Sequence, residues 1–160
     1  YSEYDAKNLF VRDDKKRNYY LITVKGNKKV DLKKFRKTNE TRPLTFASEQ
    51  DLMDILKLHP GSVSPFGLLN DESLKVMFCL DKAFLDGKQI IGIHPNDNTA
   101  TVWLKVADLV DIIKEHGNQV DFVELNWERK LKIWSYKFKR YYIVWYIEYR
   151  KNKIDRNIKS

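Results

Sequence analysis

Apolar residues recur in the first 125 positions in short runs separated by polar segments. Asn8 to Asp13 and Asn18 to Lys25 are rich in Leu, Val, Ile, Tyr and Phe, and therefore predict two strands. The polar stretch between them suits a hairpin connection. The same criterion predicts further strands at Leu44 to Phe46, Lys75 to Leu80, Gln89 to His94, Thr99 to Lys105 and Val120 to Leu125.

Helical patterns lie between several of these strands. Asp31 begins a short helix, Ser48 begins a second with its apolar residues on one face, and Ala107 to His116 forms a third that Gly117 ends. Pro and Gly recur in His59 to Gly67, which predicts a loop that is neither helix nor central strand. Because strands and helices alternate without strict βαβ spacing, we expect an α/β protein of the α+β type, with helices packed on a mixed sheet.

The composition changes sharply after residue 125. All 6 Gly and all 4 Pro lie before residue 126, whereas 3 of the 4 Trp lie after it. This break predicts two parts, a folded domain over residues 1–125 and a basic aromatic segment over residues 126–160. The second part has the spacing of a helix with Asn126 as N-cap, because apolar and aromatic side chains are three or four residues apart: Trp127, Leu131, Trp134, Phe138, Tyr141, Trp145 and Tyr149.

Three interpretations of residues 126–160 stay open. The aromatic stripe is a packing face of an extra helix, or it binds tRNA or an anionic membrane surface through Lys137, Lys139 and Arg140. The third interpretation, which we slightly favour, is an unselected and disordered tail. Its richness in Lys, Ile, Tyr and Asn is what AT-rich DNA gives when it is read past a stop or out of frame.

The net charge of +8 first suggests a partner with phosphates, since the chain has 30 Lys and Arg against 22 Asp and Glu. Residues 126–160, however, hold 11 of the basic and 3 of the acidic residues, so residues 1–125 carry 19 of each. The predicted domain is neutral. Its function must therefore be inferred from particular residues and not from the pI.

Length and cysteine usage narrow the class of protein. The 160 residues allow one domain with a sizeable core. A single cysteine, Cys79, excludes a disulfide framework and a multi-cysteine metal site, so we expect a cytoplasmic protein. No run of 18 apolar residues predicts a transmembrane helix, and the polar first residues predict no signal peptide. The chain starts at Tyr1, which suggests that an upstream element is missing.

Familiar phosphate-binding and metal motifs are absent from the sequence. It contains neither GxxxxGK[ST] nor GxGxxG, and it has no HExxH spacing. We therefore expect no cofactor and no catalytic metal.

Three segments place polar groups where they could act on a ligand. Lys7 and Asn8 begin an apolar strand, Gly61 to Pro65 forms a Gly-Ser-Val-Ser-Pro turn, and His94 ends a strand. Each has an ordinary structural explanation: a solvated strand end, a plain turn and a hydrogen-bonded histidine. Each also has a chemical one, since Lys binds phosphates or oxyanions, turns present backbone N–H groups, and His transfers protons.

Taken together and in order, these segments resemble a known family. The matching residues are Lys7-Asn8-Leu9-Phe10, Leu44-Thr45-Phe46-Ala47, Gly61 to Gly67 with Asn70-Asp71, and His94-Pro95 with Asn98-Thr99-Ala100-Thr101. They resemble the YbaK/ProX-type aminoacyl-tRNA deacylases, most closely the prolyl-tRNA editing proteins that act on alanyl-tRNA(Pro). The resemblance covers residues 6–125.

The resemblance implies a YbaK/ProRS editing-domain fold, with a partly barrel-like sheet. It implies a cofactor-free hydrolase that removes alanine in trans from mischarged tRNA(Pro), with prolyl-tRNA synthetase as a possible partner and no membrane association. Lys7, Gly61 and His94 are then the catalytic candidates. The substrate-binding candidates are Asn8, Ser62, Val63, Ser64, Pro65, Phe66, Asn98 and Thr101.

Several alternatives remain at this point. Lys7 could stabilise the developing oxyanion or bind the terminal phosphates of the tRNA. Ser62 or Ser64 could act as a nucleophile with His94 as base, which we rank low because no acidic residue is evidently placed to orient His94.

Selectivity by size exclusion would need small apolar walls, with Ile91, Ile93 and Phe66 as candidates. Family members usually have a helix and a strand upstream of the Lys motif, and we expect this element to be missing. The alternative functions are deacylation of another mischarged tRNA, such as cysteinyl-tRNA(Pro), and a non-catalytic tRNA-binding module of the same fold.

Overall fold

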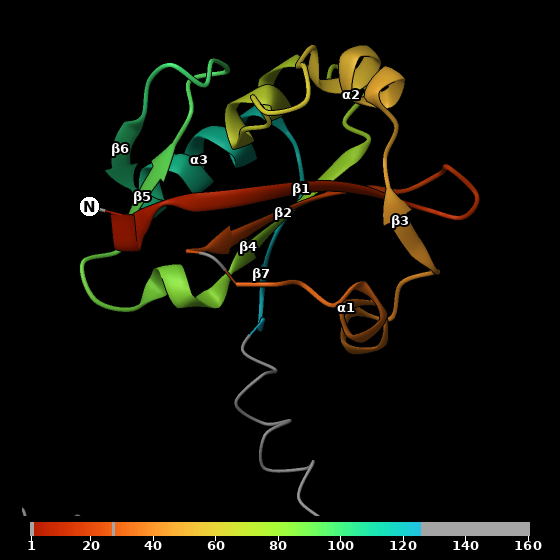
Figure 1. Ribbon diagram of the computed structural model, residues 1–160, viewed down its shortest axis with the longest axis horizontal. Helices are drawn as coiled ribbons and strands as arrows, with labels where there is room; N and C mark the ends of the chain where they lie inside the picture. Colours follow the sequence, from red (N-terminus) through yellow and green to blue (C-terminus); the bar gives the residue numbers. More distant parts are fainter. Residues whose placement is uncertain (1, 27, 126–160) are drawn as a thin grey trace, which may run out of the picture. The chain divides into compact units, whose positions relative to one another are not determined.

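The computed structural model describes residues 2–26 and 28–125, which are built around a five-stranded mixed sheet (Figure 1). The strand order is β3-β1-β2-β4-β7. β1 pairs antiparallel with β2 and β3, whereas β2 pairs parallel with β4, and β4 with β7. The bounds are β1 Ala6–Asp13, β2 Tyr19–Lys25, β3 Leu44–Phe46, β4 Val76–Asp81 and β7 Val120–Val123. The predicted α+β class is confirmed.

A second, two-stranded sheet lies beside the N-terminal end of β1. It consists of β5 Ile90–Ile93 and β6 Val102–Lys105, which pair antiparallel. An isolated parallel bridge joins Asp5 to Gly92. A Cβ atom at Gly92 would collide with the ring of Trp103, so the close packing of this hairpin requires glycine. The bridge places the end of β5 alongside the start of β1, on the edge of β1 that β2 does not occupy.

The β1–β2 hairpin is held by the fully buried carboxylate of Asp13. It accepts hydrogen bonds from the backbone N–H groups of Lys15, Arg17 and Asn18, and from the Asn18 side chain at 2.8 Å. Burial alone raises the pKa of Asp13, but these hydrogen bonds, led by that of Arg17, outweigh burial and hold the pKa below its ordinary value. The polar connection that the sequence predicts is thus a carboxylate-centred turn.

Helices cover both faces of the main sheet (Figure 1). α2 Glu49–Leu56 and α3 Val106–His116 lie on one side, and α1 Leu32–Asn39 lies on the other. Asp31 caps α1, and Ser48 forms a capping box with Asp51 at the start of α2, as the sequence predicts. Short 3₁₀ helices occupy Ser2–Tyr4, Pro65–Asn70 and Lys82–Leu85.

The prediction that His59 to Gly67 is not helical is wrong at its end. A 3₁₀ helix begins at Pro65, because the first helical position needs no N–H donor and because the Ser64 hydroxyl accepts the Phe66 N–H at 3.3 Å. Gly67 lies inside this helix, where a Cβ would approach Leu58 Cδ1 to 2.6 Å. The close contact with Leu58 explains why glycine occupies position 67, where the sequence pattern suggested a residue that prevents a helix.

The two faces of the sheet are both packed. Phe10, Leu21 and Phe78 are buried in one cluster with Leu52 from α2 and Leu109 from α3. On the other face, α1 contributes the buried Phe35, whose ring meets Tyr20 edge-on at 6.5 Å between centroids.

Cys79 is also buried, in β4, which lies between β2 and β7 in the sheet. Burial, with a smaller contribution from Asp121, raises the pKa of its thiol to about 12. The thiol is therefore protonated at neutral pH and a poor nucleophile.

Among the described residues, no helix has the length and apolarity needed to cross a membrane. The predictions for residues 126–160 lie outside the described residues, and the domain boundary proposed after residue 125 stays a prediction.

Candidate functional site

The Gly61–Pro65 turn links β1 to the end of β5. The Asn8 side chain donates to the Val63 carbonyl at 3.1 Å, and the Ser64 hydroxyl donates to the His94 carbonyl. The two strands pair only at Asp5 and Gly92, so the turn bridges them where their pairing has stopped. Three segments far apart in the sequence thus meet at one place, as the site predicted from sequence requires.

Asn8 is also hydrogen-bonded to Thr23, a residue that was not among the candidates predicted from the sequence. The hydroxyl of Thr23, fully buried in β2, donates to the Asn8 side-chain oxygen at 2.7 Å. The amide group of Asn8 is therefore oriented by Thr23, so that its nitrogen faces Val63. The sequence held a signal for this contact: Thr23 is the one threonine in β2, and the hairpin register places it opposite Asn8.

The turn leaves backbone donors available. Gly61 has φ of +89°, a conformation that glycine adopts without strain. The N–H and the hydroxyl of Ser62 both donate to the His59 carbonyl, at 3.1 and 2.9 Å. Among the hydrogen bonds of the described residues, none uses the N–H groups of Gly61 and Val63. These two groups can donate to a ligand.

A cavity of about 260 Å³ opens beside this turn and the free edge of β1. On this edge of β1, the last backbone contact with the β3 segment is the hydrogen bond from Ala47 N–H to Phe10 C=O, at 3.0 Å. The backbone groups of Asn8 point to the same side, because alternate residues of a strand direct them to the same edge. Phe46, 60% exposed, is one of the lining residues. The lining residues are Asn8, Leu9, Phe10, Phe46, Ala47, Ser48, Glu49, Leu52, Pro60, Gly61 and Val63.

His94 has a defined tautomer in this arrangement. Its Nδ1 lies 2.8 Å from the Ala100 carbonyl oxygen, which can only accept, so Nδ1 carries the proton in the neutral ring and Nε2 presents a lone pair. Asp97 lies in the same connection between β5 and β6. Hydrogen bonds from the Thr99 N–H and hydroxyl, with a smaller effect of His94, lower the pKa of Asp97.

The two serines of the Gly61–Pro65 turn are not placed to act as nucleophiles. Ser64 is buried, and its hydroxyl bonds the His94 carbonyl rather than the imidazole. The Ser62 hydroxyl is bonded within its own turn to His59. Neither serine has the contact with a base that nucleophilic catalysis requires.

Lys7 lies apart from these groups. It is exposed and pairs opposite Val24, whereas Asn8 pairs opposite Thr23 on the other face of the hairpin. No salt bridge joins Lys7 to another of the described residues. Its ammonium group is thus available, but its side chain starts from the face of β1 opposite to the turn.

The remaining candidates divide into exposed and buried positions. Asn98 and Thr101 are exposed in the connection between β5 and β6, whereas Pro65 is buried and Phe66 is half-buried against the core. Ile91 and Ile93 are 0% and 2% exposed and belong to the core cluster. These two isoleucines present no surface to the cavity beside the turn, contrary to the expectation that they wall it.

Asn70 and Asp71, which also match the family pattern, have structural contacts. Asp71 is 2% exposed and accepts from the N–H groups of Lys75 and Val76 and from the Asn118 amide. The Asn70 amide donates to Leu56 C=O at 2.9 Å. Both side chains stabilise the connection that leads into β4.

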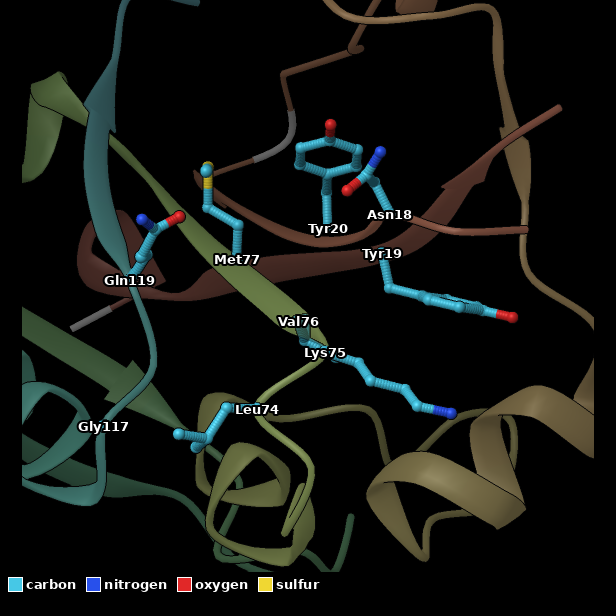
Figure 2. A pocket seen from close by; sticks show the side chains of 9 residues that line it. All are labelled: Asn18, Tyr19, Tyr20, Leu74, Lys75, Val76, Met77, Gly117 and Gln119. Carbon is cyan, nitrogen blue, oxygen red and sulfur yellow. The ribbon is translucent and has the colours of Figure 1, made fainter. Parts of the chain in front are cut away.

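A second cavity, of about 190 Å³, lies at the start of β2 and β4 (Figure 2). It is lined by Asn18, Tyr19, Tyr20, Leu74, Lys75, Val76, Met77, Gly117 and Gln119. In Figure 2, Tyr19 and Lys75 point away from Asn18 and Tyr20, so the polar groups of the lining do not meet at one point, and no candidate residue is among them. A site needs polar groups that converge, so this cavity is not the functional site.

Comparisons with known proteins match the chain to one family. A model of the aminoacyl-tRNA editing domain matches residues 2–112. Over 123 residues the chain is 45% identical to the prolyl-tRNA editing protein ProX of Acetoanaerobium sticklandii, which covers 77% of this chain and 74% of that protein. Over 126 residues it is 35% identical to prolyl-tRNA synthetase associated domain-containing protein 1 of Mus musculus, covering 77% and 73%.

A solved structure of a candidate trans-editing enzyme for prolyl tRNA synthetase also resembles this fold. It superposes with a TM-score of 0.60 at 21% identity, covering 78% of this chain and 72% of that one. At this level of identity the likeness shows the fold.

Proposed function

The chain belongs to the aminoacyl-tRNA editing domain family, which makes it an aminoacyl-tRNA hydrolase, and we propose that it removes alanine in trans from mischarged tRNA(Pro). The names of its relatives, a prolyl-tRNA editing protein and a prolyl-tRNA synthetase associated protein, support tRNA(Pro) as the substrate and the synthetase as a partner. The observation that carries the proposal is the turn at Gly61, whose two available N–H groups border a cavity.

The turn supports ester hydrolysis by water. Attack of water on the ester carbonyl forms a C–O bond and places negative charge on the carbonyl oxygen. Cleavage of the bond to the ribose then releases alanine as a carboxylate; one proton of the water goes to the ribose oxygen and the other to solvent. The N–H groups of Gly61 and Val63 are fixed donors for the developing charge. Asn8 holds Val63 in place through its carbonyl.

His94 is proposed to border the aminoacyl pocket. Its Nε2 lone pair is a suitable acceptor for the ammonium group of the amino acid, because Nδ1 is already bonded to Ala100. In this role His94 orients the ester, and it needs no serine partner.

Lys7 is proposed to bind a terminal phosphate of the tRNA. Between its two candidate roles, the geometry favours this one, because Lys7 starts from the face of β1 opposite to the turn and is exposed without a salt bridge to the described residues. An exposed ammonium group of this kind suits a mobile anionic backbone better than a fixed oxyanion.

The cavity does not by itself supply size selection. A volume of about 260 Å³ admits a prolyl group as readily as an alanyl group. Discrimination between these amino acids therefore depends on contacts formed with the bound substrate, and it has to be measured directly.

The test is a deacylation assay of the full chain on tRNA(Pro) charged with alanine, cysteine or proline. We expect release of alanine and retention of proline; faster release of cysteine would replace alanine as the substrate. Lys7→Ala should lower kcat/KM at least tenfold, mainly through KM, whereas Lys88→Ala, an exposed lysine far along the chain, should not. Binding of tRNA without hydrolysis of any ester would contradict the proposal and indicate a non-catalytic tRNA-binding module.

A further inference from the structure

The neutral charge of residues 1–125 conceals two oppositely charged halves. Residues 1–42 contain 13 Lys and Arg against 6 Asp and Glu, whereas residues 43–125 contain 6 against 13. A surface with a strong positive field can therefore exist on a body whose net charge is zero.

Helix α1 presents part of this positive charge to solvent. Leu32 and Phe35 turn toward the sheet, with Phe35 fully buried. Lys33, Arg36 and Lys37 are exposed, and their spacing of three and four residues puts them on the opposite face of the helix. None of the three has a salt bridge to another described residue.

The tip of the β1–β2 turn carries a second group of basic residues. Lys15, Lys16 and Arg17 are exposed at its tip. Arg42, which follows α1, makes a bidentate pair with Asp14 of the turn at 2.7 and 2.9 Å. This pair ties the turn to the segment after α1. Lys15, Lys16, Arg17, Lys33, Arg36 and Lys37 are called the basic surface below.

We propose that the basic surface binds the phosphate backbone of the acceptor stem of the tRNA, an inference that rests on the proposed function. The strand that follows α1 connects the basic surface with the candidate site: β3 runs from the side of the sheet where α1 lies toward α2 (Figure 1), and its last residue, Phe46, lines the cavity beside Gly61. An RNA stem that lies on α1 and follows this edge brings its 3′ end to the cavity.

The composition of the surface favours RNA over a lipid bilayer. Peripheral membrane binding combines cations with apolar side chains that enter the bilayer. The exposed large apolar side chains of the described residues are Phe46, Leu69, Leu74, Leu85, Val102, Trp103 and Ile112, and none belongs to residues 15–37. Phosphate contacts need only the cations.

The test compares two triple charge reversals in the full chain. Lys33→Glu/Arg36→Glu/Lys37→Glu alters the basic surface, and Lys75→Glu/Lys88→Glu/Lys114→Glu alters three exposed lysines of the acidic half, with the same change in net charge. Fluorescence anisotropy measures the Kd for uncharged tRNA(Pro) at several salt concentrations. We expect the first variant to bind about tenfold or more weakly, with a salt slope smaller by about 2, and the second to change much less.

Hydrolysis separates this inference from the proposed function. On alanyl-tRNA(Pro), the basic-surface variant should show a raised KM with kcat unchanged. Alanyl-adenosine, which lacks the stem, should be hydrolysed equally by variant and parent. If the parent hydrolyses neither ester, the proposed function is wrong. The comparison of tRNA binding by the two variants would still decide whether the basic surface binds RNA.

Three results would overturn the proposal: unchanged tRNA binding by the first variant, equal weakening in both variants, or loss of binding to phosphatidylserine vesicles with tRNA binding retained. The neutral variant Lys33→Gln/Arg36→Gln/Lys37→Gln should give an intermediate Kd. Every variant keeps the buried Phe35 that packs α1 against the sheet, so we expect all of them to fold. Thermal melting followed by circular dichroism checks that they do.

Discussion

Two groups of polar side chains at strand ends differ in how their hydrogen bonds are used. Around Asp71, the carboxylate is buried and bonded to Lys75, Val76 and Asn118. Around the Gly61 turn, the side chains of Asn8 and Ser64 hold the backbone in place while the N–H groups of Gly61 and Val63 are left available. The first group uses its polar capacity to stabilise the fold, and the second uses it to keep donors open for a ligand.

The contrast shows that a residue in a family pattern need not act on substrate. Asn70 and Asp71 follow the Gly61 turn closely in the sequence, yet they join backbone groups within the fold. Substitutions should therefore separate stability from turnover. Variants of both groups, and of the Asp13 turn, test this separation.

Asp71→Ala should lower the free energy of unfolding by about 3 kcal/mol or more, because it leaves the buried N–H of Val76 without an acceptor and removes one of the two acceptors of the Asn118 amide. Urea unfolding monitored by circular dichroism measures the change. The exposed neighbour Glu72 provides the control, and Glu72→Ala should have little effect. Activity per folded molecule should persist; a loss of kcat in fully folded Asp71→Ala would place this carboxylate in the site.

Gly61→Ala should lower kcat about a hundredfold, since a residue with a side chain disfavours φ of +89° and shifts the donors of the turn. Gly87 has φ of +62° and equally open space around it, so Gly87→Ala imposes similar strain away from the site. Both variants should lose about 1 kcal/mol of stability. Equal activity of the two variants would show that the Gly61 turn takes no part in the reaction.

Asn8→Asp should lower kcat/KM about tenfold. The carboxylate still accepts from Thr23 but cannot donate to Val63, so the turn loses one of its two attachments. Thr23→Val makes the complementary change, and should cost about 1 kcal/mol of stability with a smaller loss of activity. Steady-state kinetics and urea unfolding of both variants check the prediction, which a reversed order of the two activity losses would contradict.

Asp13→Asn should reduce the sensitivity of the fold to acid. The pKa of Asp13 is lowered in the folded state, so its ionised form contributes stability above the ordinary value of 3.8, and this contribution is lost as the pH falls below 3.8 through the folded pKa. Unfolding free energies at pH 5 and pH 3 should therefore differ less in Asp13→Asn than in the parent. An equal drop in both proteins would assign the acid sensitivity to other carboxylates.

Local signals in the sequence predicted most of the elements. The N-caps at Asp31 and Ser48 and the stop at Gly117 mark helix ends that the structure confirms, because capping depends on neighbouring residues alone. The 3₁₀ helix at Pro65 was missed, since a proline that breaks a helix interior also starts a helix well. The segments that carry the chemistry were identified from the residues of four motifs and from their order, both of which can be seen in the sequence without a structure.

Contacts between distant segments could not be predicted in this way. That Lys7 starts from the opposite face to Asn8 follows from strand alternation alone, so this feature was predictable from the sequence. The burial of Ile91 and Ile93, by contrast, depends on which elements pack over β5.

By itself, the sequence determined the class of the fold, the family and the segments that carry the chemistry, because helix caps, hydrophobic periodicity and motifs depend on residues that are close together in the chain. Only the tertiary structure decided that Thr23 orients Asn8, that Ser64 bonds the His94 carbonyl instead of the imidazole, and that Arg42 pairs with Asp14 of the β1–β2 turn. Each of these facts depends on a contact that joins residues remote in the chain, and such contacts form only when the sheet and its helices pack.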